Sequence, residues 1–208
     1  MYVFVAFLNV TFAFAQSNSA KAILDEVSKK YDGYKTIQSN FTFSASLANG
    51  EDHSDRGQLF LNKVNKQYKI TLPTQDLISD GKSIWSVLKE DKEVQVSDAE
   101  NSSQSIGPSN IFTFYNSGYK FGNSSNVSSS QGNLTAIDLT PEDTKSNYSK
   151  IQVRINKNKH IHDVTIFDKS GAKYIYTINT LYVNNPIASS TFEFNKSKYP
   201  GFELVDLR

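Results

Sequence analysis

The chain has 208 residues, and its 22 basic and 21 acidic side chains nearly cancel. This balance argues against a nucleic-acid partner, because nucleic-acid-binding proteins usually carry a basic excess or a basic stripe. The absence of cysteine excludes disulfides, thiolate metal sites, a cysteine nucleophile and a lipid anchor on an N-terminal cysteine.

The first residues have the pattern of a secretion signal. Residues 1–15 are uncharged and mostly apolar, and they end in Ala-Phe-Ala, the small-x-small pattern of a signal-peptidase site. A membrane anchor is the alternative, but a span needs about 20 apolar residues, and Asn9 and Thr11 interrupt this run. We therefore predict a cleaved signal peptide over 1–15 and a single domain over 16–208.

An amphipathic helix is predicted directly after this segment. Ser17 or Ser19 can cap its start, and Gly33 can end it. Charged residues occupy one side, so the helix should lie with its other side on an apolar surface. The apolar side is formed by residues at steps of three and four: Ala20, Ile23, Leu24, Val27 and Tyr31.

From Ile37 onward the apolar period changes from 3.6 to 2, which is typical of β-strands. Turns of the Asn-Gly, Asp-Gly and Ser-Gly type separate several strands, and such short connections join antiparallel neighbours. We therefore predict one long meandering sheet that curls and has a concave inner face. The expected strands are 37–47, 57–63, 67–72, 76–79, 83–88, 93–97, 133–140, 150–156, 161–168, 172–183 and 191–194.

Two segments interrupt the strand pattern. Residues 107–115 contain Pro108 near their start, followed by apolar and aromatic residues, which predicts a short helix or lid. Residues 122–132 are rich in Ser, Asn and Gly, which predicts a low-complexity surface loop.

Aromatic and histidine side chains are candidates for a binding function. The 14 Phe and 11 Tyr can form an ordinary core or line a ligand cavity, and composition alone favours the core. His160 and His162 share one strand face and could hold a metal ion, but no third ligand is evident. A solvated strand face is the preferred interpretation, and no metal site is predicted.

Sequence motifs of catalysis are absent. There is no GxSxG nucleophile elbow and no glycine-rich phosphate loop. A triad scattered over several strands would leave no such motif, so a secreted hydrolase stays open as an alternative. We predict no enzymatic activity and no cofactor.

Residues 78–85 resemble a hairpin of the LolA family of outer-membrane lipoprotein carriers. They comprise an aliphatic strand, an Asp-Gly-Lys turn and then a Trp. Three other segments agree in order and spacing with this family: the helix running into 34–41, the strand at 57–61, and the C-terminal part 192–208. Together these segments cover nearly the whole chain after the signal peptide. The Ser- and Asn-rich insertion at 122–132 departs from the family pattern.

The resemblance implies an incomplete antiparallel β-barrel, covered by an N-terminal helix and short lid helices, with an apolar cavity for acyl chains. It also implies a monomeric periplasmic carrier that moves lipoproteins from the inner to the outer membrane. The expected partners are acylated lipoproteins, an inner-membrane ATP-driven complex that releases them, and an outer-membrane acceptor. A periplasmic carrier or sensor of another lipid or glycolipid, with the same shape, is the first alternative.

The resemblance further implies which residues form the cavity and the lid. Lys63 stands where the best-known carriers have an Arg that fastens the lid, and Lys lacks the bidentate geometry of Arg. Which face of each strand points inward stays open, and Phe60 is an alternative to its neighbours. The cavity and lid residues carried over are Phe41, Phe43, Leu59, Leu61, Tyr68, Ile70, Trp85, Ile111, Phe112 and Phe114.

Overall fold

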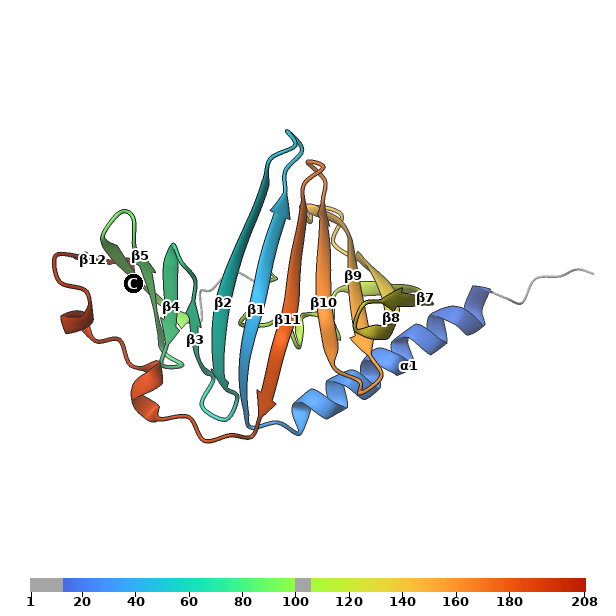
Figure 1. The fold of residues 1–208 in the computed structure, drawn as a ribbon, viewed down its shortest axis with the longest axis horizontal. Coiled ribbons are helices and arrows are strands. Elements are labelled where there is room, and N and C mark those ends of the chain that lie inside the picture. Colours follow the sequence, from blue (N-terminus) through green and yellow to red (C-terminus); the bar gives the residue numbers. More distant parts are fainter. Residues whose placement is uncertain (1–12, 100–105) are drawn as a thin grey trace, which may run out of the picture.

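The computed structural model describes residues 13–99 and 106–208, which form a mainly β fold with one α-helix (Figure 1). This confirms the predicted fold class. The helix is α1 (Ala13–Asp32), and short 3-10 helices are η2 (Phe114–Asn116), η3 (Ser189–Phe192) and η4 (Lys196–Lys198). The strands are β1 (Thr36–Ser46), β2 (Asp52–Asn62), β3 (Gln67–Thr71), β4 (Gln75–Ser79), β5 (Ser83–Leu88), β6 (Glu93–Asp98), β7 (Tyr119–Ser129), β8 (Gly132–Pro141), β9 (Tyr148–Asn156), β10 (Ile161–Asp168), β11 (Lys173–Val183) and β12 (Glu203–Asp206).

The strands form one twelve-stranded sheet in the order β12-β6-β5-β4-β3-β2-β1-β11-β10-β9-β8-β7. It consists of two antiparallel meanders, β1 to β6 and β7 to β11, which are joined where β1 pairs with β11. The sheet curls but does not close, as an incomplete barrel requires (Figure 1). The prediction of one continuous antiparallel meander is wrong at two points. The first and eleventh strands meet at the centre, and β12 pairs in parallel with β6.

The amphipathic helix is confirmed on its apolar side and at its end. Ala20, Leu24, Val27 and Tyr31 are buried, and the helix stops at the residue before Gly33. The predicted capping near residues 17–19 is wrong, since α1 already begins at Ala13. Residues 1–12 of the predicted signal peptide lie outside the described residues. Within residues 13–99 and 106–208, no helix combines the length and hydrophobicity that a membrane span requires.

The low-complexity segment 122–132 is largely a strand, contrary to the loop predicted for it. Its first eight residues belong to β7, which pairs with β8 and packs against α1. Phe121 lies opposite Leu139, and Val127 lies opposite Leu134. Ser and Asn alternate with few apolar residues along this strand, so the sequence pattern lacks the hydrophobic period that would reveal it.

The C-terminal part also differs from its prediction. Residues 191–194, predicted as a strand, begin in the 3-10 helix η3, where Phe192 is fully buried. The chain then crosses the outer face of the sheet half that contains β3 to β6, and it ends in β12 beside β6 (Figure 1). We call residues 184–202 the C-terminal strap.

Candidate functional site

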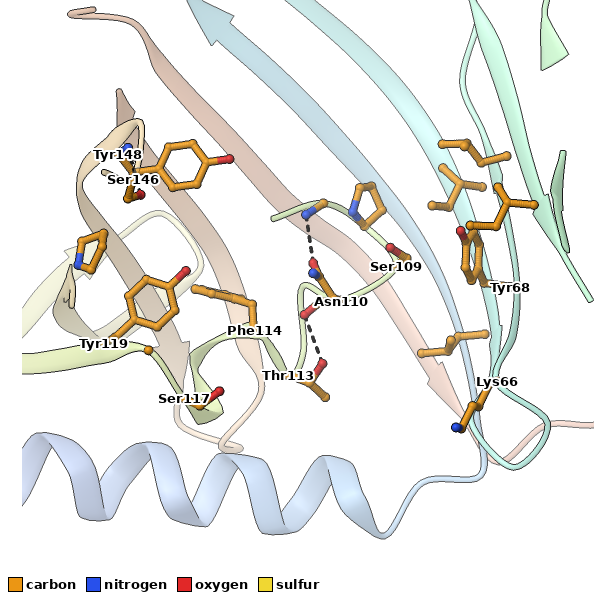
Figure 2. Close-up of a pocket in the computed structure, with 18 of the residues that line it drawn as sticks. Lys66, Tyr68, Ser109, Asn110, Thr113, Phe114, Ser117, Tyr119, Ser146 and Tyr148 are labelled. Atoms are coloured by element: carbon orange, nitrogen blue, oxygen red, sulfur yellow. Dashed lines mark hydrogen bonds between the residues drawn. The ribbon is translucent and has the colours of Figure 1, made fainter. Parts of the chain in front are cut away.

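The inner face of the curled sheet holds a cavity of about 1120 Å³, which we call the inner cavity (Figure 2). It lies between two walls, one from β2 to β6 and one from the region around η2, β7 and the start of β9. Its lining comprises Leu61, Lys66, Tyr68, Ile70, Leu77, Ile84, Ser86, Ser97, Gly107, Pro108, Ser109, Asn110, Thr113, Phe114, Ser117, Gly118, Tyr119, Pro141, Asp143, Ser146 and Tyr148.

The wall formed by β2 to β5 is mainly aliphatic. Leu61 lies opposite Tyr68 in the β2–β3 ladder, and Ile70 lies opposite Leu77 in the β3–β4 ladder. Directly opposed residues in an antiparallel pair point to the same face, so these side chains form one continuous patch. Ile84 of β5 extends the patch to the next strand.

The segment 106–116, which we call the lid segment, lies inside the curl of the sheet. Ile111, Phe112 and Tyr115 are buried, and the ring of Phe112 stacks on that of Tyr31 of α1 at 4.7 Å between centroids. The backbone N–H of Gly107 donates to the Asn110 side-chain oxygen at 2.9 Å, which stabilises the turn that starts the segment (Figure 2). The lid segment therefore fills part of the interior and separates the inner cavity from α1.

The opposite wall is aromatic and polar. Tyr119 begins β7 and Tyr148 begins β9. Phe114 contacts Tyr119 edge to face, at 5.7 Å between ring centroids. Asp143 and Ser146 come from the turn between β8 and β9. A ligand in the inner cavity would therefore contact hydrocarbon on one side and hydrogen-bonding groups on the other.

Lys63 contacts the C-terminal end of α1. Its ammonium donates to the Tyr31 carbonyl oxygen at 2.6 Å and lies 3.7 Å from the Asp32 carboxylate. A cation at this place is favourable because the last carbonyls of a helix carry partial negative charge. Lys63 also lines a second cavity of about 210 Å³, together with Phe112 and Leu61. Lys63 thus binds the end of α1 and lies beside the lid segment, and its lid-fastening role stays a prediction.

The structure divides the ten predicted cavity residues into four groups. Leu61, Tyr68, Ile70 and Phe114 line the inner cavity. Phe41, Leu59, Ile111 and Phe112 are buried in the adjoining core, where Phe41 packs over Gly57. Phe43 lies half-buried against Tyr174 and Tyr176 of β11.

Trp85 alone forms the fourth group. It does not line the inner cavity, so its prediction as a cavity residue is wrong. Its ring stacks on Phe194 of the C-terminal strap, with 5.7 Å between centroids, on the outer face of the sheet. The physical reason is the two-residue period of a strand, which places Ile84 inside and therefore Trp85 outside. The family resemblance located the hairpin but did not determine which of its faces points inward.

Several lining residues were not predicted. Leu77 and Ile84 lie in strands whose alternation was recognised, so a correct choice of face would have found them. Tyr119 and Tyr148 begin strands that follow turn-rich, polar stretches, and no sequence signal distinguishes them from other surface tyrosines.

The two histidines on β10 and its preceding turn have separate partners. The Nε2 atom of His160 lies 2.8 Å from the Tyr34 hydroxyl, and burial together with the Lys30 ammonium lowers the pKa of His160. His162 hydrogen-bonds to the buried Asp163, which also pairs with Arg154 at 2.8 Å. Among the described residues, no group of three or more His, Cys, Asp or Glu side chains could hold a metal ion.

The chain is thus a protein with an open, curled sheet, an inserted lid segment and an inner cavity. The chain belongs to the LolA family, since the family model described as outer membrane lipoprotein carrier protein LolA matches residues 32–195. None of the curated protein sequences compared with this chain matches it.

Solved structures resemble the fold at low sequence identity. An uncharacterized conserved protein from Thermus thermophilus aligns with a TM-score of 0.60 and 10% identity, over 90% of this chain and 99% of that one. A putative outer membrane lipoprotein-sorting protein domain from Vibrio parahaemolyticus has a TM-score of 0.47 and 13% identity, over 88% and 99%. A LolA superfamily protein from Nitrosomonas europaea has a TM-score of 0.44 and 12% identity, over 84% and 97%.

Proposed function

We propose that this protein is a periplasmic carrier that holds the acyl chains of lipoproteins in the inner cavity and moves them from the inner to the outer membrane. The observation that carries the proposal is the aliphatic wall of β2 to β5 facing a cavity of about 1120 Å³ in a LolA-family fold. The carrier acts by reversible binding, without catalysis and without a cofactor.

Hydrocarbon burial supplies the binding energy in this proposal. Each acyl methylene removed from water contributes about 0.8 kcal/mol, so several chains would bind too tightly for release unless binding also carried a cost. The lid segment supplies such a cost, because its buried side chains must shift to admit more hydrocarbon. Its Tyr115 hydroxyl is buried with no hydrogen-bond partner among the described residues, a defect that typically costs about 1–3 kcal/mol. This cost makes the packed position of the lid segment less stable than its apolar contacts alone would make it.

The partners in this proposal follow from the chemistry of loading and release. The protein is exported by its predicted signal peptide and acts as a monomer. Acylated lipoproteins are loaded by an inner-membrane ATP-driven releasing complex, because the sequence has no nucleotide-binding loop of its own. An outer-membrane acceptor takes the cargo.

A carrier or sensor of another lipid or glycolipid is the second candidate. The polar side of the inner cavity favours it, since Ser109, Ser117 and Ser146 would be poor neighbours for hydrocarbon alone.

The first experiment is mass spectrometry of molecules that co-purify with the tagged mature protein from its native periplasm. Stoichiometric intact lipoproteins are expected. Free lipid or glycolipid would favour the second candidate, and the absence of any lipid together with hydrolytic turnover would contradict a carrier function.

A matched pair of variants makes this experiment specific to the inner cavity. Leu61→Lys introduces a charge into the aliphatic wall and should reduce the co-purified lipid at least about tenfold, because an unpaired ammonium is costly to bury. Val64→Lys adds the same charge on the adjacent turn, where the side chain is 70% exposed, and should retain the lipid. Equal lipid content in both variants would place the ligand elsewhere.

A further inference from the structure

Three tyrosine hydroxyls line the inner cavity without a hydrogen-bond partner among the described residues. Tyr68 stands on the aliphatic wall, while Tyr119 and Tyr148 stand on the facing wall (Figure 2). The hydroxyls of Tyr31, Tyr34 and Tyr199, in contrast, are hydrogen-bonded within the described residues. The Tyr31 hydroxyl accepts from the backbone N–H of Ile161 at 3.2 Å, and the Tyr199 hydroxyl donates to Asp76 at 3.0 Å.

Three polar side chains of the lid and turn segments that line this cavity form hydrogen bonds within the protein. The Asn110 side chain accepts from the backbone of Gly107, and the Thr113 hydroxyl donates to the Asn110 carbonyl oxygen. The Ser146 hydroxyl accepts from the backbone N–H of Tyr148. These bonds stabilise the backbone, whereas the three tyrosine hydroxyls contribute nothing comparable to the fold.

The charged groups of the lining lie at its rim. Lys66 and Asp143 are both exposed, and every other side chain that lines the cavity is uncharged. Burial raises the pKa of Tyr68, and burial together with the neighbouring Tyr148 raises the pKa of Tyr119. Both hydroxyls therefore stay protonated at neutral pH and can donate. A fatty acid carboxylate seated between the walls would lack a cation, which is unfavourable in an apolar site.

We propose that Tyr68, Tyr119 and Tyr148 form a subsite that donates hydrogen bonds to the ester or amide carbonyls linking acyl chains to the head of the ligand. The subsite rests on the proposed carrier function and narrows its ligand class. Hydrocarbon that displaces water from a hydroxyl without offering an acceptor loses that hydrogen bond, whereas a carbonyl replaces it. The cavity therefore selects acylated molecules with uncharged carbonyl linkages over fatty acids and ether lipids. Such linkages occur in lipoprotein anchors and in glycerolipids alike.

The test compares ester and ether ligands on the wild-type protein and on Tyr68→Phe/Tyr119→Phe/Tyr148→Phe, which keeps the rings and removes the hydroxyls. Equilibrium binding of radiolabelled dipalmitoylglycerol and of the carbonyl-free dihexadecylglycerol gives an ester-to-ether affinity ratio. We expect an ester-to-ether affinity ratio of about tenfold or more for the wild type, because each hydrogen bond should raise the ester affinity about threefold. The ratio should fall toward one in the triple variant, mainly through loss of ester affinity.

Tyr182→Phe is the matched control, because Tyr182 is 55% exposed and lies outside the cavity lining. It should keep the wild-type ratio. A triple variant that also keeps the wild-type ratio, while melting like the wild type, would overturn the subsite and leave the carrier function intact. Failure of the wild type to bind either ligand or a triacylated lipopeptide would overturn both proposals.

The lipopeptide also distinguishes the two sources of acyl carbonyls. Tighter binding of the lipopeptide than of dipalmitoylglycerol, lost in the triple variant, would support the subsite with a lipoprotein anchor as ligand. Tighter binding of dipalmitoylglycerol, lost in the same variant, would support it with a glycerolipid.

Discussion

The two faces of the sheet half formed by β3 to β6 differ in what covers them, and the inner face borders the inner cavity. On the outer face, Ile78, Val87, Val94 and Val96 are buried beneath the C-terminal strap. On the inner face, the aliphatic Ile70, Leu77 and Ile84 line the inner cavity together with the polar Ser86 and Ser97. Both faces carry aliphatic side chains, and those of the outer face become core because the C-terminal strap covers them.

The strap succeeds as a cover because it brings its own aromatic side chains. Phe194 stacks on Trp85, and Tyr199 stacks on Phe194, each at 5.7 Å between ring centroids. Tyr199 also donates to Asp76, which pairs with Lys89 at 2.8 Å. The lid segment, in contrast, packs mainly against α1 and the centre of the sheet, so the wall of β3 to β5 stays open.

The largest expected effect is a loss of stability, without a loss of lipid affinity, when a residue of the outer face is replaced. Trp85→Ala removes the half-buried ring that stacks on Phe194, and we expect the free energy of unfolding to fall by about 2–4 kcal/mol, because a large aromatic contact beneath the strap is lost. Lipid affinity should stay within about twofold of wild type. Urea titration and equilibrium lipid binding measure the two quantities. A loss of lipid affinity with unchanged stability would indicate instead that Trp85 lines the inner cavity.

A smaller effect is expected at Gly57, where the inner face is densely packed. A Cβ atom added to Gly57 would lie 2.3 Å from the Phe41 ring, so the ring must move. Gly57→Ala should therefore lower the free energy of unfolding by about 1–3 kcal/mol, as overpacking usually does. Gly107→Ala is the control, because its added Cβ meets no atom within 4 Å. Equal unfolding midpoints in urea for both variants would contradict dense packing at Phe41.

The smallest expected effect is a dependence of the free energy of unfolding on pH. The pKa of His160 is lowered from its ordinary value of 6.5 by burial and by Lys30, so the unfolded state takes up the proton at a higher pH than the folded state. Stability should therefore be complete above about pH 6.5 and decrease as the pH falls below that value. The urea midpoint should be slightly lower at about pH 5.5 than at about pH 7.5. His160→Gln should flatten this dependence, and an unchanged dependence in this variant would contradict the role of His160.

Local patterns in the sequence were sufficient for much of the fold. The apolar side of α1 was predicted residue by residue, and the bounds of β5 and β10 agree with the strands predicted at 83–88 and 161–168. The helical period of α1 is clear because Ala20, Leu24, Val27 and Tyr31 form one buried side. The family resemblance, carried by ordered short segments, agrees with the match over residues 32–195.

Three features were decided only by tertiary structure: the pairing of β1 with β11, the strand β7, and the face on which Trp85 lies. The first joins strands that lie far apart in the sequence, and no local pattern records such a partner. The second is a polar strand stabilised by β8 and α1 rather than by its own hydrophobicity. The third depends on which face the C-terminal strap covers. Alternation along a strand states that it has two different faces, but only the packing of distant segments determines which of them encloses the cavity.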